Sequence, residues 1–180
     1  MLLTIFNEIP DHRRAQGRRY ELSYVLLFSV MAIASGADSY RTIETFILGH
    51  FKKLKKKFKL SWKRSPDYTT VREIIKGVDS KEMENAFRRY AGILTNLDSK
   101  KYVFVGLDGK TIRGSFDNFH DQTAIQIFSA FLTGRNIILA HEEIAGQKTN
   151  EIPIAQKLVK ELGVGKCVYT LDAMHCQKKH

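Results

Sequence analysis

The stretch Tyr-Val-Phe-Val-Gly-Leu-Asp, residues 102–108, decides the fold of the second half of the chain. Its short, continuous apolar run is typical of a strand buried on both faces, and an aspartate directly follows the run. Two further apolar segments, residues 124–132 and 136–144, are predicted strands joined by a turn at Gly134 and Arg135. The second half of the chain therefore begins with three strands in succession.

A helix and a fourth strand follow these three strands. Asn150 is the predicted N-cap of the helix. Its inner face carries apolar residues at helical spacing: Ile152, Ala155, Leu158, Val159 and Leu162. Residues 167–171 are the predicted fourth strand, and Asp172 directly follows it. In this β-β-β-α-β order the first and fourth strands can be parallel neighbours connected through the helix.

Two aspartates, Asp108 and Asp172, occupy matching positions after the first and fourth strands. If these strands are parallel neighbours, their carboxyl ends meet at one edge of the sheet, and we expect the two carboxylates to lie close together. Two carboxylates repel each other unless a cation lies between them, and oxygen ligands favour Mg²⁺ or Mn²⁺ over zinc. The sequence thus predicts a divalent-cation site. The alternative, in which each aspartate is only a turn or cap residue, stays open.

Residues 1–98 are predicted to be helical. The run 22–35 is apolar all round, as in a central core helix, and its 14 residues fall short of the roughly 20 that a membrane span needs. Candidate N-cap residues open three further helices: Asp38 or Ser39, Thr70 with Glu73, and Asp79 with Glu82. The last two helices, separated by Gly77, suggest a helix-turn-helix-like DNA-binding unit. A plain helical bundle with a solvated lysine face is the alternative.

The chain is strongly basic, with 29 Lys and Arg against 19 Asp and Glu and a formal net charge of +10. The segment 52–64 is its most basic part, with eight such residues out of thirteen: Lys52, Lys53, Lys55, Lys56, Lys57, Lys59, Lys63 and Arg64. Such side chains neutralise phosphates in a salt-dependent, largely sequence-independent way. We therefore expect the first half of the chain to bind a polyanion. Phe58 and Trp62 are expected to anchor this segment in the core rather than to stack on bases.

Composition excludes several classes of protein. With 43% hydrophobic residues and only three prolines, the chain is globular rather than disordered. Two cysteines cannot form a disulfide framework and the N-terminus does not look like a signal peptide, so a reducing cytoplasm is the expected compartment. His141-Glu142-Glu143 lacks the cysteine pair of a zinc deaminase, and residues 163–166 lack the spacing of a P-loop.

Three ordered segments resemble the DDE transposases of bacterial insertion sequences, and specifically the H-repeat-associated family. They are Leu-Asp-Gly-Lys-Thr-Ile-Arg-Gly-Ser at 107–115, Gln-Lys-Thr-Asn-Glu-Ile at 147–152 and Tyr-Thr-Leu-Asp-Ala-Met-His-Cys-Gln at 169–177. Residues 9–14, Ile-Pro-Asp-His-Arg-Arg, and the run 24–36 resemble the N-terminal associated domain of that family. The resemblance covers nearly the whole chain, and the three segments together are specific.

The resemblance implies an α+β, or α/β, chain of two domains. Residues 1–98 would form a helical DNA-binding domain, and residues 99–180 would form the N-terminal part of a ribonuclease-H-like catalytic domain. The implied partner is double-stranded transposon-end DNA, and the implied location is the bacterial cytoplasm, in association with the nucleoid. No membrane partner is implied.

The implied activity is DNA transposition, by metal-dependent phosphodiester cleavage and strand transfer at a site with two Mg²⁺ or Mn²⁺ ions. Asp108 and Asp172 match the first two carboxylates of the DDE triad. Glu151 opens the predicted helix where ribonuclease H enzymes also place an acidic ligand, and we hypothesise that it approaches the metals; the alternative is a first-turn Glu that favours the positive helix end. Lys110 and Arg113 are candidate phosphate contacts or ordinary solvated residues.

The third family carboxylate, a Glu on a helix further downstream, has no match up to His180, so we expect cleavage to be impaired. Gln126 stands where the family commonly has a His. The alternative function is a catalytically inactive DNA-binding relic that occupies sites or pairs with full-length transposase. A third class is a helical module for another polyanion.

An uncovered apolar face and strand edge would also promote low stability or self-association.

Overall fold

A computed structural model describes residues 1–95, 102–112, 115, 124–144, 151–162 and 166–171, with only the backbone of residue 151. The chain divides into two compact units, Met1–Ala86 and Phe87–His180. The division falls within one helix, upstream of the change expected between residues 98 and 99. That expected domain boundary stays a prediction.

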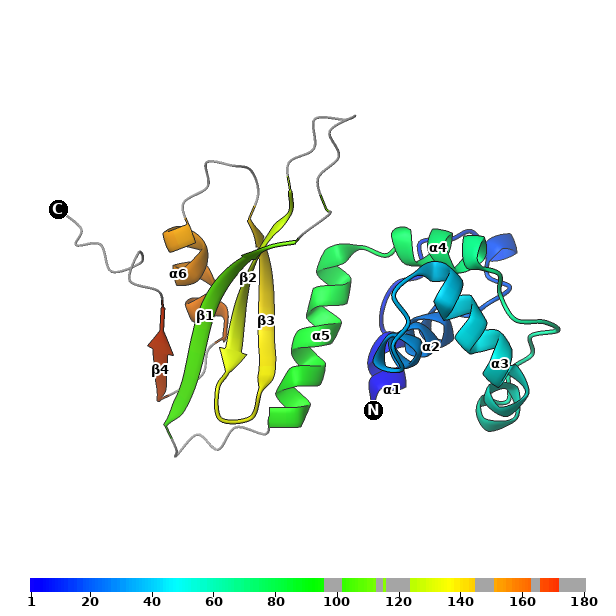
Figure 1. Cartoon of the computed structure of the whole chain (residues 1–180), viewed down its shortest axis with the longest axis horizontal. Helices are drawn as coiled ribbons and strands as arrows, with labels where there is room; N and C mark the ends of the chain where they lie inside the picture. The colour runs from blue at the N-terminus through cyan, green and yellow to red at the C-terminus, as the bar shows by residue number, and fades with distance from the viewer. Residues whose placement is uncertain (96–101, 113–114, 116–123, 145–150, 163–165, 172–180) are drawn as a thin grey trace. The chain divides into compact units, whose positions relative to one another are not determined.

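The first unit is helical, as predicted (Figure 1). Its elements are α1 (Leu2–Phe6), a 3₁₀ turn η1 (Ala15–Gly17), α2 (Leu22–Ala34), α3 (Tyr40–Phe58), α4 (Tyr68–Lys76) and the start of α5 (Ser80–Thr95). Helix α2 supplies the fully buried Val25 and Phe28 and is the central helix that its apolar sequence predicted. It is not buried all round, however, because Val30 and Ile33 are 42% and 59% exposed.

Side-chain caps define where the helices of this unit begin. Ser39 caps α3 in a capping box with Thr42, as one of the two predicted caps. The predicted Thr70–Glu73 capping box is wrong: α4 begins earlier, and Asp67 accepts a hydrogen bond from the backbone N–H of Thr70. Asp79 accepts from the N–H groups of Lys81 and Glu82, as expected for the cap of α5.

The basic segment is partly helical. Helix α3 runs on through its lysines to Phe58, and Lys59 ends it in the left-handed conformation, with φ of 52°. Trp62 is 1% exposed, and its ring lies 5.8 Å from that of Phe28, edge to face. The ring of Phe58 lies 5.4 Å from that of Phe28. The prediction that Phe58 and Trp62 anchor the segment in the core is confirmed.

The second unit contains a four-stranded mixed sheet and a helix. In chain order these are β1 (Val103–Thr111), β2 (Gln126–Leu132), β3 (Ile137–Ile144), α6 (Glu151–Leu162) and β4 (Cys167–Thr170). The strand order is β3-β2-β1-β4. β2 is antiparallel to both of its neighbours, whereas β1 and β4 are parallel. The prediction that the first and fourth strands are parallel neighbours joined through the helix is confirmed.

Helix α6 covers one face of this sheet. Ala155 and Leu158 of α6 form one core with the inward-facing residues of the strands: Val103, Val105, Leu107, Phe128, Ala130, Leu132, Leu139, Ala140 and Ile144. The prediction that β1 is buried on both faces is wrong. Its alternate residues face away from α6, and Phe104 is 54% exposed.

Helix α5 contacts β3 and α6 from Phe87 onward. The rings of Phe87 and His141 are 5.0 Å apart. The Arg88 guanidinium donates to the His141 carbonyl at 3.0 Å, to Glu142 at 3.2 Å and to Glu161 of α6 at 2.8 Å. This part of α5 is therefore bound to the sheet, and the helix-turn-helix-like unit stays a prediction. Within the described ranges, no helix is long and apolar enough to cross a membrane.

Candidate functional site

Asp108 lies inside β1 rather than directly after it. The antiparallel pairing of β1 with β2 continues through Asp108, opposite Ser129, to Thr111 opposite Gln126. The sequence prediction ended the strand at Leu107 because the apolar run ends there, but the strand continues where β2 alone supplies its partners. The parallel ladder with β4 stops earlier, at Gly106 and Thr170.

The Asp108 carboxylate is open to solvent, with 64% of its side chain exposed. Strand alternation places it on the face of β1 opposite to the buried Val105 and Leu107. Lys110, two residues on and on the same face, has its Nζ 3.4 Å from Asp108 Oδ2 and is 79% exposed. Such an exposed pair contributes about 0–1 kcal/mol, so a cation or a phosphate can displace either partner at little cost.

Several predicted site residues lie outside what the structure describes. Asp172 and Arg113 are outside the described ranges, and Glu151 is described only as the first residue of α6. In the sequence, Asp108 lies two residues after Gly106, and Asp172 lies two residues after Thr170. Among the described residues, no three His, Cys, Asp or Glu side chains gather as a metal-binding group. The metal ligand set therefore stays a prediction.

The predicted phosphate contacts on α3 are not equivalent. Lys52, Lys53, Lys56 and Lys57 are exposed along the helix. Lys55 instead donates from Nζ to the carbonyl oxygen of Trp62 at 2.6 Å and so stabilises the chain after the helix. Beyond the helix end, Lys59, Lys63 and Arg64 are also exposed. Among the described residues, only Lys55 of the eight would have to break a side-chain hydrogen bond in order to bind a polyanion. The other seven basic side chains can bind one without this loss.

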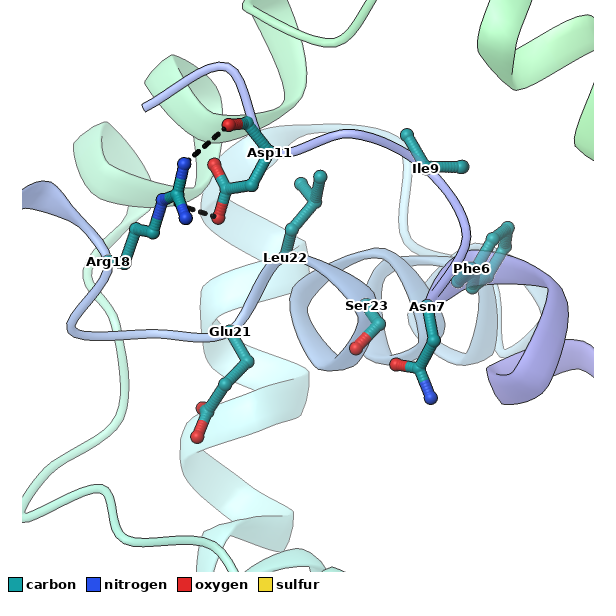
Figure 2. Close-up of a pocket in the computed structure, with 8 residues that line it drawn as sticks. All are labelled: Phe6, Asn7, Ile9, Asp11, Arg18, Glu21, Leu22 and Ser23. Carbon is teal, nitrogen blue, oxygen red and sulfur yellow. Dashed lines mark hydrogen bonds and ion pairs between the residues drawn. The ribbon is translucent and has the colours of Figure 1, made fainter. Parts of the chain in front are cut away.

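Arginines near the N-terminus form an ion-pair cluster that the sequence analysis did not assign to a site. Arg13 pairs with Asp11 at 2.7 Å, and Arg18 lies 3.7 Å from the same carboxylate. Figure 2 shows Asp11 and Arg18 at the rim of a shallow hollow next to the start of α2. At about 200 Å³ this hollow is below the size range of small-molecule sites. The sequence signal for this cluster was the pair of Arg-Arg dipeptides at 13–14 and 18–19.

Known proteins give an independent comparison. A family model described as DDE_Tnp_1-associated matches residues 3–91. The chain is 32% identical over 185 residues to "Putative transposase YncI" of Escherichia coli O157:H7 and to its namesake of strain K12; the matches cover 98% of this chain and 44% and 70% of those proteins. It is 29% identical over 170 residues to "H repeat-associated putative transposase YhhI" of strain K12, covering 94% of this chain and 44% of that protein. No solved structure matches.

The match of residues 3–91 to the transposase-associated model, together with the 32% identity to a putative transposase of which the chain covers 70%, places the chain in the class of insertion-sequence transposases. Within this class, the chain belongs to the H-repeat-associated family. The resemblance drawn from its three sequence segments is thereby confirmed. The chain spans only 44% of the length of two of the relatives named above. The activity of a whole transposase is therefore only proposed for this chain.

Proposed function

We propose that the chain acts in DNA transposition, in the bacterial cytoplasm at the nucleoid. Its helical unit would bind double-stranded transposon-end DNA, and its sheet unit would take part in metal-dependent phosphodiester cleavage and strand transfer. The observation that carries the proposal is the parallel β1–β4 ladder ending at Gly106 and Thr170, with an aspartate two residues further on in each segment of sequence. The strand order β3-β2-β1-β4, with a helix between β3 and β4, supports a ribonuclease-H-like arrangement.

Asp108 and Asp172 would hold Mg²⁺ or Mn²⁺, with Glu151 as a further ligand. When bound, a pair of such ions activates a water or a DNA 3′-hydroxyl and stabilises the leaving oxygen. Asp108 suits a hard cation because its carboxylate is exposed and, among the described residues, is bound only by an exposed lysine. A cation at Asp108 would free Lys110 to bind a DNA phosphate, with Arg113 as a second phosphate contact.

Binding of the DNA backbone would come mainly from the lysines of α3. Four of them lie exposed within two turns of one helix, so they present several positive charges on a rigid element. Each phosphate that such a residue neutralises releases a counterion, so binding weakens steeply as salt rises. This mode of binding needs no base contacts and suits a polyanion-binding module attached to a separate reaction site.

Metal-dependent nicking of supercoiled DNA tests the proposal. We expect weak nicking with Mg²⁺ or Mn²⁺, impaired because the third family carboxylate has no match, that is lost in Asp108→Ala while DNA binding is retained. Glu143→Gln is the matched control, since Glu143 is an exposed carboxylate on β3 of the same sheet. Salt-sensitive DNA binding without nicking would instead identify a DNA-binding relic. Tighter binding to RNA or to lipid vesicles than to duplex DNA would overturn both assignments.

A further inference from the structure

We propose that a second basic segment, the arginine loop of residues 12–19, joins the lysine-rich segment 52–64 in one surface that binds the phosphate backbone of duplex DNA. The two segments are far apart in the sequence and are brought together by Trp62. This inference rests on the proposed function and adds phosphate-binding residues that the sequence did not predict.

The side chain of Arg13 stabilises the conformation of the arginine loop. Its guanidinium donates to both carboxylate oxygens of Asp11, at 2.9 and 2.7 Å, and to the carbonyl oxygens of Gly17 and Tyr20, at 3.0 and 2.7 Å. Only 12% of the Arg13 side chain is exposed. The loop is therefore held in one conformation before any ligand arrives, which reduces the entropy lost on binding.

The turn after α4 also supports the loop. A Cβ atom at Gly77 would overlap the imidazole ring of His12, so the ring packs directly against this turn. Arg18 donates to the carbonyl oxygens of Arg13 and Asp11, at 2.8 and 2.9 Å, yet half of its side chain stays exposed. Arg18 thus shapes the loop and also adds positive charge at its surface.

Besides Arg18, the loop presents the side chains of Arg14 and Arg19 to solvent. Both are exposed, and neither pairs with a carboxylate in the part of the chain that the structure describes. The Arg19 guanidinium lies 5.6 Å from the centre of the Tyr20 ring. Guanidinium groups offer planar, forked donors that match phosphate oxygens, so two such groups on a preformed loop are suited to backbone contacts.

Trp62 links the loop to the lysine-rich segment. The Tyr20 ring lies 4.9 Å from the Trp62 ring, edge to face, and the Tyr20 hydroxyl donates to the Ser65 carbonyl at 3.3 Å. The Trp62 indole N–H donates to the carboxylate of Glu21. Lys63 and Arg64, which are exposed, lie in the sequence between these two contacts. The end of the arginine loop therefore lies directly against the end of the lysine-rich segment.

The acidic side chains of this region are already engaged. Asp11 accepts from Arg13 and lies near Arg18, and the hydrogen bonds from Arg13 lower the pKa of Asp11 despite its partial burial. Glu21 accepts from Trp62. Glu73, which lines a hollow together with His12, Arg13 and Gly17, pairs with Arg72 at 2.7 Å. These carboxylates are therefore compensated within the fold, and the surface stays positive. Because Trp62 is buried, it offers no stacking platform for unpaired bases, which favours duplex over single-stranded DNA.

Anisotropy measurements of labelled duplex DNA binding to the full chain, over a range of salt concentrations, test this inference. The test variant is Arg14→Ala/Arg19→Ala. The control is Lys81→Ala/Lys160→Ala, which removes the same charge from exposed positions on α5 and α6. We expect the test variant to lower low-salt affinity about tenfold and the log–log salt slope by about 1.8, at roughly 0.9 for each phosphate neutralised. The control should change little, and both variants should melt as the wild type does.

Three results would overturn the inference: unchanged binding by the test variant, an equal loss in the control, or single strands bound as tightly as duplex. If the wild type binds duplex DNA and Lys56→Ala/Lys57→Ala weakens binding while the arginine variant does not, only this inference fails. If the wild type does not bind duplex DNA at low salt, the proposed function fails together with it.

Discussion

Gly106 of β1 and Thr170 of β4 are the last Cα partners of a parallel ladder that begins at Val103 and Cys167. Parallel neighbours run in register, so each further residue along one strand has its counterpart on the other. Asp108 and Asp172 occupy such counterpart positions in the sequence. This relationship joins the fold to the proposed chemistry, and it makes a direct prediction about metal binding.

Asp108→Asn and Asp172→Asn should each weaken Mn²⁺ binding at least tenfold, and the double variant should be little worse than either alone. Two ligands of one ion act as a unit, so removing the second adds little once the first is gone. Isothermal titration with Mn²⁺ measures both effects. Glu143→Gln is the control carboxylate and should leave Mn²⁺ affinity unchanged. Two additive, independent losses would show that the aspartates do not share an ion.

Arg88→Ala should destabilise the sheet unit by about 2 kcal/mol, because a partly buried hydrogen bond to a charged group contributes roughly 1.5–3 kcal/mol and the more exposed pair with Glu161 adds little. Arg88 and Glu142 are 24% and 22% exposed, and Arg88 also bonds the edge of β3 and helix α6. Urea denaturation of the full chain measures the loss. Arg88→Lys should recover only part of it, since an ammonium cannot span the same three acceptors with fixed geometry.

Arg72→Ala is the matched control for Arg88. Arg72 pairs with Glu73 at 2.7 Å, but 47% and 69% of these side chains are exposed. An exposed pair contributes about 0–1 kcal/mol, so this variant should unfold close to the wild-type midpoint. Equal losses from Arg72 and Arg88 would show that the contacts of Arg88 with β3 and α6 contribute no more than an ordinary surface pair.

Sheet topology was predictable from the sequence because few connections are physically allowed. Three strands followed by a helix and a strand have a right-handed crossover as the favoured connection, and this places the fourth strand parallel to the first. The end of β1 was not predictable from apolar residues alone. Asp108 and Lys110 continue the strand because Ser129 and Ile127 of β2 lie opposite them as partners.

Two kinds of interaction explain why the other features could not be predicted from the sequence: competing caps close together in the chain, and contacts between residues far apart in it. Asp67 and Thr70 are both good capping residues three positions apart, and only the structure shows that Tyr68 and Thr69 are already helical. Arg88 had no sequence signal, because its partner Glu161 lies 73 residues away. The arginine loop was missed for the same reason: Tyr20, which follows the loop, contacts Ser65, which follows the lysine-rich segment, 45 residues away.

Asp67→Ala should lower the stability of the helical unit by about 1 kcal/mol, the usual effect of losing an N-cap. Hydrogen bonds from the Thr69 hydroxyl and the Thr70 backbone N–H lower the pKa of Asp67 from 3.8 to about 2. Because the folded-state pKa is depressed, the stabilisation is present above pH 4 and is lost as the pH falls from 3.8 towards 2. Thermal melts at several pH values measure this loss.

Asp67→Asn is the control, since asparagine caps as well as aspartate but does not titrate. Its melting temperature near neutral pH should lie close to that of the wild type, and the contribution of residue 67 should no longer change between pH 4 and pH 2. If Asp67→Asn is as unstable as Asp67→Ala, the stabilisation comes from the charge and not from the hydrogen bonds of the cap.

Phe104→Ser should reduce self-association of the chain. Phe104 and Val168 are Cα partners on β1 and β4, on the face that α6 does not cover, and they are 54% and 37% exposed. Neighbouring apolar side chains near a sheet edge favour contact with a second copy. Sedimentation velocity across a concentration series measures the association. Ile33→Ser, at a 59% exposed position on α2, is the control. A monodisperse wild-type monomer would contradict this prediction.

Replacing Lys52, Lys53, Lys56 and Lys57 with alanine should weaken duplex DNA binding and flatten its salt dependence, by about 0.9 in log–log slope for each phosphate that the variant no longer neutralises. Lys55→Ala should behave differently. Its Nζ bonds the Trp62 carbonyl, so the variant should lower the melting temperature and change the salt slope little. Parallel melting and anisotropy measurements separate the two effects. If Lys55→Ala reduces the salt slope as much as the substitution of its exposed neighbours does, Lys55 leaves the carbonyl of Trp62 to bind phosphate.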